Sequence, residues 1–279
     1  MVNVKTVLFP TDFSDFSNKA FPYAASLATA FNAKIIMMHV EELEEEDPAN
    51  PKHSFSALEA YAGPLETERV IIRGHAPYKD ILDVSRGKHC DLIVMPTHGR
   101  SSLSQFFLGG SVAEDVARFS TIPVFIAKIE ADQPPETYTG RVKEILFSTD
   151  LSEGSLRALQ YARGFADKFA AKLYVLHVID DDCGAFYANK GLAREAPDFA
   201  AKVTDLLKQV AGPDAGFDAS FNVAEGRAES EIVKFAEANS VDLITMSTHG
   251  HAGLREEVIG TTSARVIRHA PCPVLTVRG

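Results

Sequence analysis

The chain contains the same long pattern twice, and this internal repeat limits its fold more than any other feature. The segment VKTVLFPTDFSDFS at 4–17 matches VKEILFSTDLSEGS at 142–155, and CDLIVMPTHG at 90–99 matches VDLITMSTHG at 241–250. The matching segments follow the same order, and the two copies lie far enough apart to be whole domains instead of short solenoid units. The sequence therefore predicts two domains of the same fold.

The spacing between the copies predicts where they differ and where they join. The offset is 138 residues for the first pair of segments and 151 for the second pair, so the second copy is longer by 13 residues after its second strand. The segment 128–141 is polar and contains prolines, which is typical of a linker. We therefore expect a first domain at 1–129, a linker at 130–141 and a second domain at 142–279.

Short runs of Val, Ile and Leu alternate with amphipathic, helix-like segments in both copies. The runs are apolar at consecutive positions, so each strand is expected to be buried on both faces. Such strands with helices between them predict an α/β fold with a parallel sheet. Ser14 and Ser152 are expected to cap the first helix of each copy. In the second copy the expected strands are 143–148, 172–178, 219–224, 242–247 and 273–278.

The carboxyl ends of parallel strands meet at one edge of the sheet, where open α/β folds bind ligands. In both copies Thr-His-Gly follows an expected central strand, and Asp12 or Asp150 follows the first strand. Glycine lets backbone N–H groups approach an anion, and a helix beginning at 260–261 adds unpaired N–H groups and a positive dipole end. A carboxylate after the first strand can accept hydrogen bonds from a ribose or an adenine amino group. Because the pattern occurs twice, it favours a nucleotide-type pocket over loops and caps that only stabilise the fold.

At these residues the chain resembles the universal stress protein family in a tandem two-domain form. The resemblance covers almost all 279 residues and is carried by LFPTDFS and LFSTDLS, MMHV and VLHV, DLIVMPTHGR and DLITMSTHGH, and RHAPCPVLTV. It implies two tandem Rossmann-like domains, each a five-stranded parallel sheet flanked by helices, of the adenine nucleotide alpha hydrolase-like type. It also implies that ATP or AMP binds through the motif Gly-x2-Gly-x9-Gly-[Ser/Thr].

The second copy matches that motif more closely than the first. Its first glycine position is Ser247, its second is Gly250, and Gly260-Thr261 follow after nine intervening residues. In the first copy Pro96 takes the first position, Gly99 takes the second, and Gly109-Gly110-Ser111 follow. Either Gly110 stands at the Ser/Thr position there, or the loop is one residue longer. The proline before the last strand follows Gly109 by 14 residues and Gly260 by 13, which favours the longer loop.

Carried over residue by residue, the resemblance implies binding positions in both copies. Adenine and ribose would lie at the ends of the first two strands, and phosphates at the glycine loop and the helix after it. In the second copy these positions are Ser148, Thr149, Asp150, Val178, Ser247, His249, Gly250, His251, Gly260, Thr261 and Thr262. In the first copy they are Pro10, Thr11, Asp12, Val40, Gly99, Arg100, Gly110 and Ser111. Arg100 is placed to pair with a phosphate, whereas His251 would do so only when protonated.

Three functions remain open from the sequence. The first is a cytoplasmic stress-response protein that binds adenine nucleotide, ATP or AMP with Mg²⁺ as an accompanying ion, preferably in the second copy. The second is a nucleotide-free tandem module that acts through protein contacts, which Pro96 and Ser247 support. The third is an enzyme such as an ATP pyrophosphatase, against which the missing SGGxDS-type loop argues. The sequence positions no general base, so no activity beyond a slow ATPase is expected.

Charge and cysteine content limit the partners and the compartment. The net charge is −10, without a basic block to neutralise phosphates, so nucleic-acid binding is not expected. Three scattered cysteines fit a reducing cytoplasm, and the lack of a long apolar run or signal peptide argues against a membrane or export. The resemblance implies that the last strands pair the two domains as an internal pseudo-dimer, while a homodimer of whole chains stays open.

Other candidate sites are weaker. His39 and His177 lack the spacing of metal ligands, so packed, hydrogen-bonded histidines are favoured and no metal site is predicted. Cys90 aligns with an apolar residue of the second copy, which favours a core thiol over a nucleophile. The segments GHAP at 74–77 and GRAE at 226–229 are expected to be turns that lead into helices.

Overall fold

The chain folds into two compact units, one built mainly from residues 2–141 and the other mainly from residues 142–274. The computed structural model describes residues 2–42, 55–98, 112–129, 140–180, 184–211, 219–248 and 261–279. Within these residues no helix is both long enough and apolar enough to cross a membrane.

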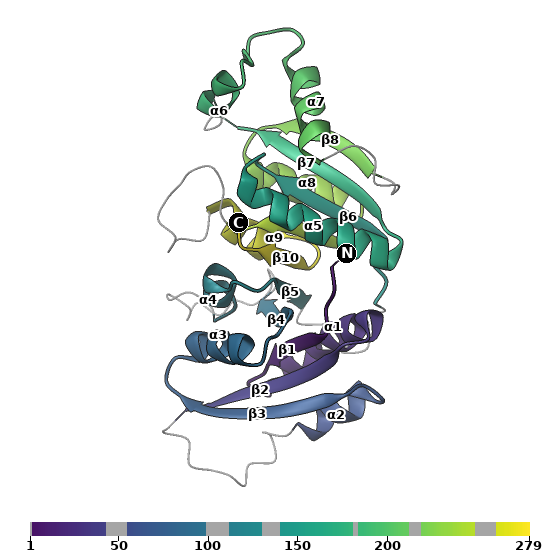
Figure 1. Cartoon of the computed structure of the whole chain (residues 1–279), viewed down its shortest axis with the longest axis vertical. Helices are drawn as coiled ribbons and strands as arrows, with labels where there is room; N and C mark the ends of the chain where they lie inside the picture. Colours follow the sequence, from purple (N-terminus) through teal and green to yellow (C-terminus); the bar gives the residue numbers. More distant parts are fainter. Residues whose placement is uncertain are drawn as a thin grey trace. The chain divides into compact units, whose positions relative to one another are not determined.

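The first unit is a parallel sheet with helices between its strands (Figure 1). Its strand order is β3-β2-β1-β4-β5, and each neighbouring pair runs parallel. The strands are β1 (Thr6–Pro10), β2 (Lys34–Glu42), β3 (Thr67–Gly74), β4 (Leu92–His98) and β5 (Val124–Ile129). The helices are α1 (Asp15–Phe31), α2 (Ser56–Ala62), α3 (Pro77–Gly87) and α4 (Val112–Phe119).

The second unit repeats this topology with an addition between its second and third strands. Its strand order is β10-β9-β6-β7-β8, and the pairings of β6 with β7 and β9 and of β7 with β8 are parallel. The strands are β6 (Glu144–Thr149), β7 (Lys172–Ile179), β8 (Ala219–Glu225), β9 (Leu243–Ser247) and β10 (Val274–Val277). The helices are α5 (Glu153–Phe169), α6 (Gly184–Asn189), α7 (Phe199–Ala211), α8 (Ala228–Ala238) and α9 (Thr261–His269).

Right-handed crossovers decide which face of each sheet a helix covers. In the first unit the chain runs outward from β1 to β3, so α1 and α2 pack together on one face. It then returns past β1 to β4, so α3 and α4 pack together on the other face. In the second unit α5 and α7 correspond to the first pair, and α8 and α9 to the second. The α/β fold predicted from the sequence is confirmed.

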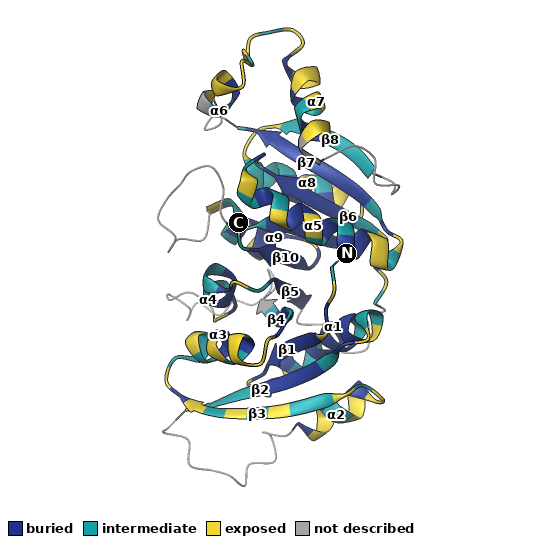
Figure 2. Ribbon diagram, viewed as in Figure 1, coloured by how far each residue is buried: buried dark blue, intermediate teal, exposed yellow. Residues whose placement is uncertain are grey.

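The first strand of each copy is buried almost throughout, β1 at every position and β6 at every position after Glu144, as their continuous apolar runs predict (Figure 2). The helices that follow these strands, α1 and α5, begin as expected, because the Ser14 and Ser152 hydroxyls accept hydrogen bonds from the N–H groups of Ser17 and Ser155. Both serines are therefore N-caps, which satisfy one of the unpaired donors at each helix start.

The addition in the second unit covers a strand that the first unit leaves open. Ile71 of β3 and Val223 of β8 occupy matching positions, opposite His39 and His177. The Ile71 side chain is 55% exposed, whereas Val223 packs against a buried cluster that α6 and α7 supply. The residues inserted after β7 therefore extend the core of the second unit.

One aspartate in each unit joins the starts of the two strands between which the strand order reverses. Oδ2 of Asp91, just before β4, accepts hydrogen bonds from the N–H groups of Lys5 and Thr6 at 2.8 and 3.0 Å. Oδ2 of Asp242, just before β9, binds the N–H groups of Lys143 and Glu144 in the same way, at 2.7 and 3.0 Å. These carboxylates hold the amino ends of the two central strands of each sheet together. The connections to opposite faces of the sheet leave from the carboxyl ends of these strands.

We expect Asp242→Ala to lower the free energy of unfolding by about 2–3 kcal/mol, because two backbone donors lose a charged acceptor. Chemical denaturation followed by circular dichroism measures this change. The control is Asp205→Ala on α7, whose carboxylate is 69% exposed and pairs with Lys208; it should change stability by less than about 0.5 kcal/mol. Equal effects of the two variants would contradict the role of Asp242.

Candidate functional site

The described candidate residues of each copy lie at the carboxyl ends of the central strands. Pro10 ends β1, and Ser148 and Thr149 end β6. Val40 and Val178 lie near the carboxyl ends of β2 and β7. Ser247 is the last residue of β9, and Thr261 and Thr262 begin α9. The candidates His249, Gly250, His251, Gly260, Gly99, Arg100, Gly110 and Ser111 lie outside the described residues.

The turn after the first strand uses most of its polar groups internally. The Thr149 hydroxyl accepts a hydrogen bond from the Leu151 N–H and contacts the Ser155 hydroxyl at 2.8 Å. Oδ1 of Asp150 accepts hydrogen bonds from both the N–H and the hydroxyl of Ser152, at 3.0 and 2.6 Å. Leu151 adopts a left-handed conformation with φ of 66°, which is uncommon outside glycine. The turn is therefore a rigid platform between β6 and α5.

The first copy builds the same turn from the same residue types. Thr11 accepts from the Phe13 N–H, and Oδ1 of Asp12 accepts from the N–H and hydroxyl of Ser14. Phe13 has a φ of 58°, like its counterpart in the second copy. The threonine hydroxyls in both copies thus support the turn, and the aspartates contribute one carboxylate oxygen each to it.

The repeated histidines are hydrogen-bonded beside this turn, His177 fully buried and His39 half-buried. Nδ1 of His39 lies 2.8 Å from the Thr11 carbonyl, and Nδ1 of His177 lies 2.8 Å from the Thr149 carbonyl. A carbonyl only accepts, so Nδ1 carries the proton in both. Among the described residues no cluster of His, Cys, Asp or Glu is arranged to hold a metal ion.

In the second copy a tyrosine completes the histidine interaction. The Tyr187 hydroxyl lies 2.5 Å from Nε2 of His177, and since Nδ1–H donates to Thr149, Nε2 of the neutral ring accepts from Tyr187. His177 and Tyr187 are almost completely buried. Tyr187 lies on α6, so this hydrogen bond joins the inserted segment to the strands that border the candidate site. The repeat pattern of the sequence does not point to Tyr187, because the insertion has no counterpart in the first copy.

A second hydrogen bond fixes the helix that follows β9. The Ser263 hydroxyl donates to the Ser247 carbonyl at 2.9 Å, across 16 residues of chain. Ser263 is buried in the first turn of α9, so this bond holds the helix start against the strand end. Ala113 stands at the matching position of the first copy and has no hydroxyl for such a bond.

The start of α9 is suited to bind an anion. Its first N–H groups have no acceptor within the helix, and the positive end of the helix dipole lies there. Thr261 is exposed and Thr262 is half-buried at this end. The second copy therefore presents backbone donors and two hydroxyls next to the end of β9.

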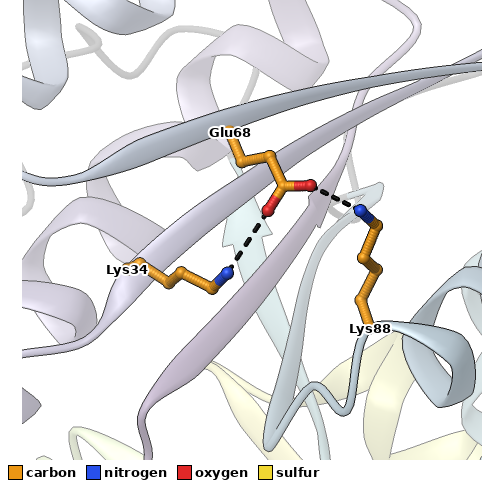
Figure 3. A network of polar contacts seen from close by, with 3 residues as sticks. All are labelled: Lys34, Glu68 and Lys88. Carbon is orange, nitrogen blue, oxygen red and sulfur yellow. Dashed lines mark hydrogen bonds and ion pairs between the residues drawn. The ribbon is translucent and has the colours of Figure 1, made fainter.

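A charged network outside this region lies at the opposite edge of the first sheet (Figure 3). Glu68 near the start of β3 binds Lys34 at the start of β2 at 3.3 Å and Lys88 after α3 at 2.6 Å. The hydrogen bond from Lys88 lowers the pKa of the Glu68 carboxyl below its usual value. Because these residues lie at the amino ends of the strands, the network connects surface elements and is separate from the candidate site.

Cys90 near this network is a core thiol. Burial raises the pKa of the Cys90 thiol to about 11, so at neutral pH it is protonated and a poor nucleophile. The interpretation of Cys90 as a packing residue agrees with the structure.

Comparison with known proteins gives a consistent result over the whole chain. The model of the universal stress protein family matches residues 3–128 and again residues 141–278. Universal stress protein Slr1230 of Synechocystis sp. is 24% identical over 311 residues, which cover 99% of this chain and 100% of that protein. Universal stress protein MJ0531 of Methanocaldococcus jannaschii is 33% identical over 143 residues, 49% of this chain and 82% of that protein.

A solved structure shows the same fold at full length. The crystal structure of a universal stress protein from Archaeoglobus fulgidus matches with a TM-score of 0.70 and 22% sequence identity. The match covers 99% of this chain and 97% of that one. The α/β fold of both units is therefore shared with a protein of known structure.

We expect Tyr187→Phe to lower the free energy of unfolding by about 1–3 kcal/mol, because it removes the buried hydrogen bond between the Tyr187 hydroxyl and Nε2 of His177. Thermal and urea denaturation measure the change. Tyr174→Phe on the same strand as His177 is the control, since the buried Tyr174 packs against Phe235 and its hydroxyl makes no hydrogen bond within the described residues. A loss as large in the control would show that the hydroxyl of Tyr187 has no specific role.

Proposed function

Because the chain belongs to the universal stress protein family, in a tandem two-domain form, we propose that its second copy binds an adenine nucleotide, ATP or AMP. Nucleotide binding would make the protein a cytoplasmic sensor or regulator in the stress response. The observation that carries the proposal is the hydrogen bond from Ser263 to the Ser247 carbonyl. It fixes the start of α9 beside the end of β9, where a phosphate would lie.

The phosphate side of the proposed site relies on backbone donors. The N–H groups of the first turn of α9 and the Thr261 and Thr262 hydroxyls would bind phosphate oxygens. A helix start that is already fixed loses little conformational entropy when the ligand binds, which favours affinity. Ser263 therefore acts as a positioning residue in this proposal, without touching the ligand.

The adenosine side relies on the rigid turn after β6. The backbone of Val178 near the end of β7 would bind the adenine edge, and the partly exposed Asp150 would bind the ribose. The Thr149 hydroxyl is assigned no ligand contact, since it serves the turn. Its backbone and that of Ser148 line this side of the proposed site.

The first copy is proposed to bind nucleotide more weakly or not at all. It has Ala113 in place of Ser263, and Pro96 within β4 in place of Ser247. Its helix after β4 therefore lacks the hydroxyl that fixes α9. We expect one nucleotide per chain.

The proposal is tested by mass spectrometry of small molecules released from gently purified protein and by calorimetric titration with ATP, Mg-ATP and AMP. We expect saturable binding near one per chain. Ser263→Ala should weaken it roughly tenfold, which corresponds to the loss of one hydrogen bond worth about 1.4 kcal/mol. Gly260→Val, at the last glycine of the motif, should abolish it.

Thr204→Ala is the matched control, because the Thr204 hydroxyl also donates to a backbone carbonyl, that of Ala200, in a solvent-exposed hydrogen bond on α7. It should leave nucleotide affinity unchanged. If wild-type protein retains no nucleotide and gives no heat with any of the three ligands, the proposal is wrong. Action through protein contacts alone would then be the remaining interpretation.

A further inference from the structure

Two arginines from different helices converge on one carboxylate oxygen in the second unit. Oε1 of Glu229, in the first turn of α8, accepts a hydrogen bond from Nη2 of Arg227 at 2.7 Å. The same oxygen accepts one from Nη1 of Arg265 on α9, also at 2.7 Å. One carboxylate therefore holds two guanidinium groups side by side.

The cluster carries a net positive charge. Although burial raises the pKa of the Glu229 carboxyl, its own backbone N–H and the two arginines more than offset this and lower the pKa below its usual value. Glu229 is thus anionic at neutral pH, and with two permanently charged arginines the three side chains sum to one positive charge.

Most hydrogen-bond donors of the two arginines point elsewhere than to Glu229. A guanidinium has five N–H donors in a fixed plane. In the part of the chain that the structure describes, the only side-chain hydrogen bond or ion pair of Arg227 or Arg265 is the one to Glu229. The Arg227 and Arg265 side chains are 72% and 48% exposed, so their remaining donors are accessible from solvent.

The cluster lies at the edge of the sheet that carries the candidate site. Arg227 is the N-cap residue of α8, and the preceding Gly226 N–H donates to the carbonyl of Ile179, the last residue of β7. Arg265 follows Thr261 by four residues, so the two lie on the same face of α9. Helical side chains lean toward the N-terminus, so the Arg265 side chain leaves α9 in the direction of its first turn and reaches Glu229 in the first turn of α8.

We propose that Arg227 and Arg265 form a subsite for the terminal phosphates of a nucleoside di- or triphosphate. This inference rests on the proposed function and adds to it a preference of the second copy for ATP and ADP over AMP. The first phosphate would lie at the helix start, and the phosphates beyond it would reach the guanidinium pair. Guanidinium groups bind phosphate oxygens through two parallel hydrogen bonds, which suits them to this role.

A structural role alone explains this cluster poorly. The Glu229 side chain is only 17% exposed, so one arginine is enough to pair its charge, and a second arginine as exposed as Arg227 contributes little to stability. The first copy has none of the three residues at the matching positions. Asp115 stands at the position of Arg265, and in the turn Gly-His-Ala-Pro at 74–77, His75 and Pro77 stand at the positions of Arg227 and Glu229. The arginine pair thus occurs in the copy that also has the Ser263 hydrogen bond.

The test is calorimetric titration of the full chain with ATP, ADP and AMP, for wild type, Arg265→Gln and Arg227→Gln. We expect wild type to bind ATP at least about tenfold more tightly than AMP, as loss of charge-assisted hydrogen bonds implies. Arg265→Gln should lower ATP affinity about tenfold and change AMP affinity by less than twofold. Arg157→Gln, at an exposed position of α5, is the control and should change neither.

Inorganic tripolyphosphate serves as a second probe that needs no adenosine site. If AMP and ATP bind equally, or if the ATP-to-AMP ratio is the same in both arginine variants as in wild type, the subsite is refuted while the proposed function stands. If no nucleotide binds but tripolyphosphate binds and Arg265→Gln weakens it, the anion subsite stands and the proposed function fails. If wild type binds neither nucleotide nor tripolyphosphate, both proposals are refuted.

Discussion

The organisation of each unit depends on how its first and fourth strands are joined at their amino ends. Asp91 and Asp242 each bind two successive backbone N–H groups ahead of the first strand, at the place where the strand order reverses. With these ends fixed, the two strands send their connections to opposite faces of the sheet at the carboxyl ends. A crevice between diverging connections is where open α/β sheets bind ligands, so the aspartates join, at their amino ends, the two strands whose carboxyl ends border that crevice.

The strands and their order along the chain could be predicted from the local sequence, whereas the hydrogen bonds between the side chains of the site could not. Apolar runs at consecutive positions predicted the strands of the second copy to within about one residue, as for 143–148 against Glu144–Thr149. The sequence shows Thr149 at the ligand edge but does not show that its hydroxyl bonds to Ser155 inside the turn. Partners distant in sequence, such as Tyr187 with His177 or Arg265 with Glu229, become visible only when the helices are placed.

The two copies share a scaffold but differ in the groups added to it. The second copy gains the Tyr187 hydrogen bond, the Ser263 hydrogen bond and the arginine pair on Glu229. The first two each connect a helix to the carboxyl end of the second sheet, and the arginine pair joins α8 to α9. Within its described residues, the first copy keeps the turn built on Thr11 and Asp12, and it has Ala113 and Asp115 at the positions of Ser263 and Arg265. Duplication thus supplied two equal frameworks, and the differences lie at the edge where a ligand would bind.

The aspartates before β4 and β9 also affect how such sequences can diverge. Their partners are main-chain N–H groups, which every residue except proline provides. The bonds therefore place no demand on the side chains at 5, 6, 143 and 144. The copies already differ at one of these two pairs of matching positions, with Thr6 in one copy and Glu144 in the other. Selection need retain only one acid per copy and exclude proline from the two positions whose N–H groups it binds. The side chains at these positions can therefore change while the junction between the strands persists.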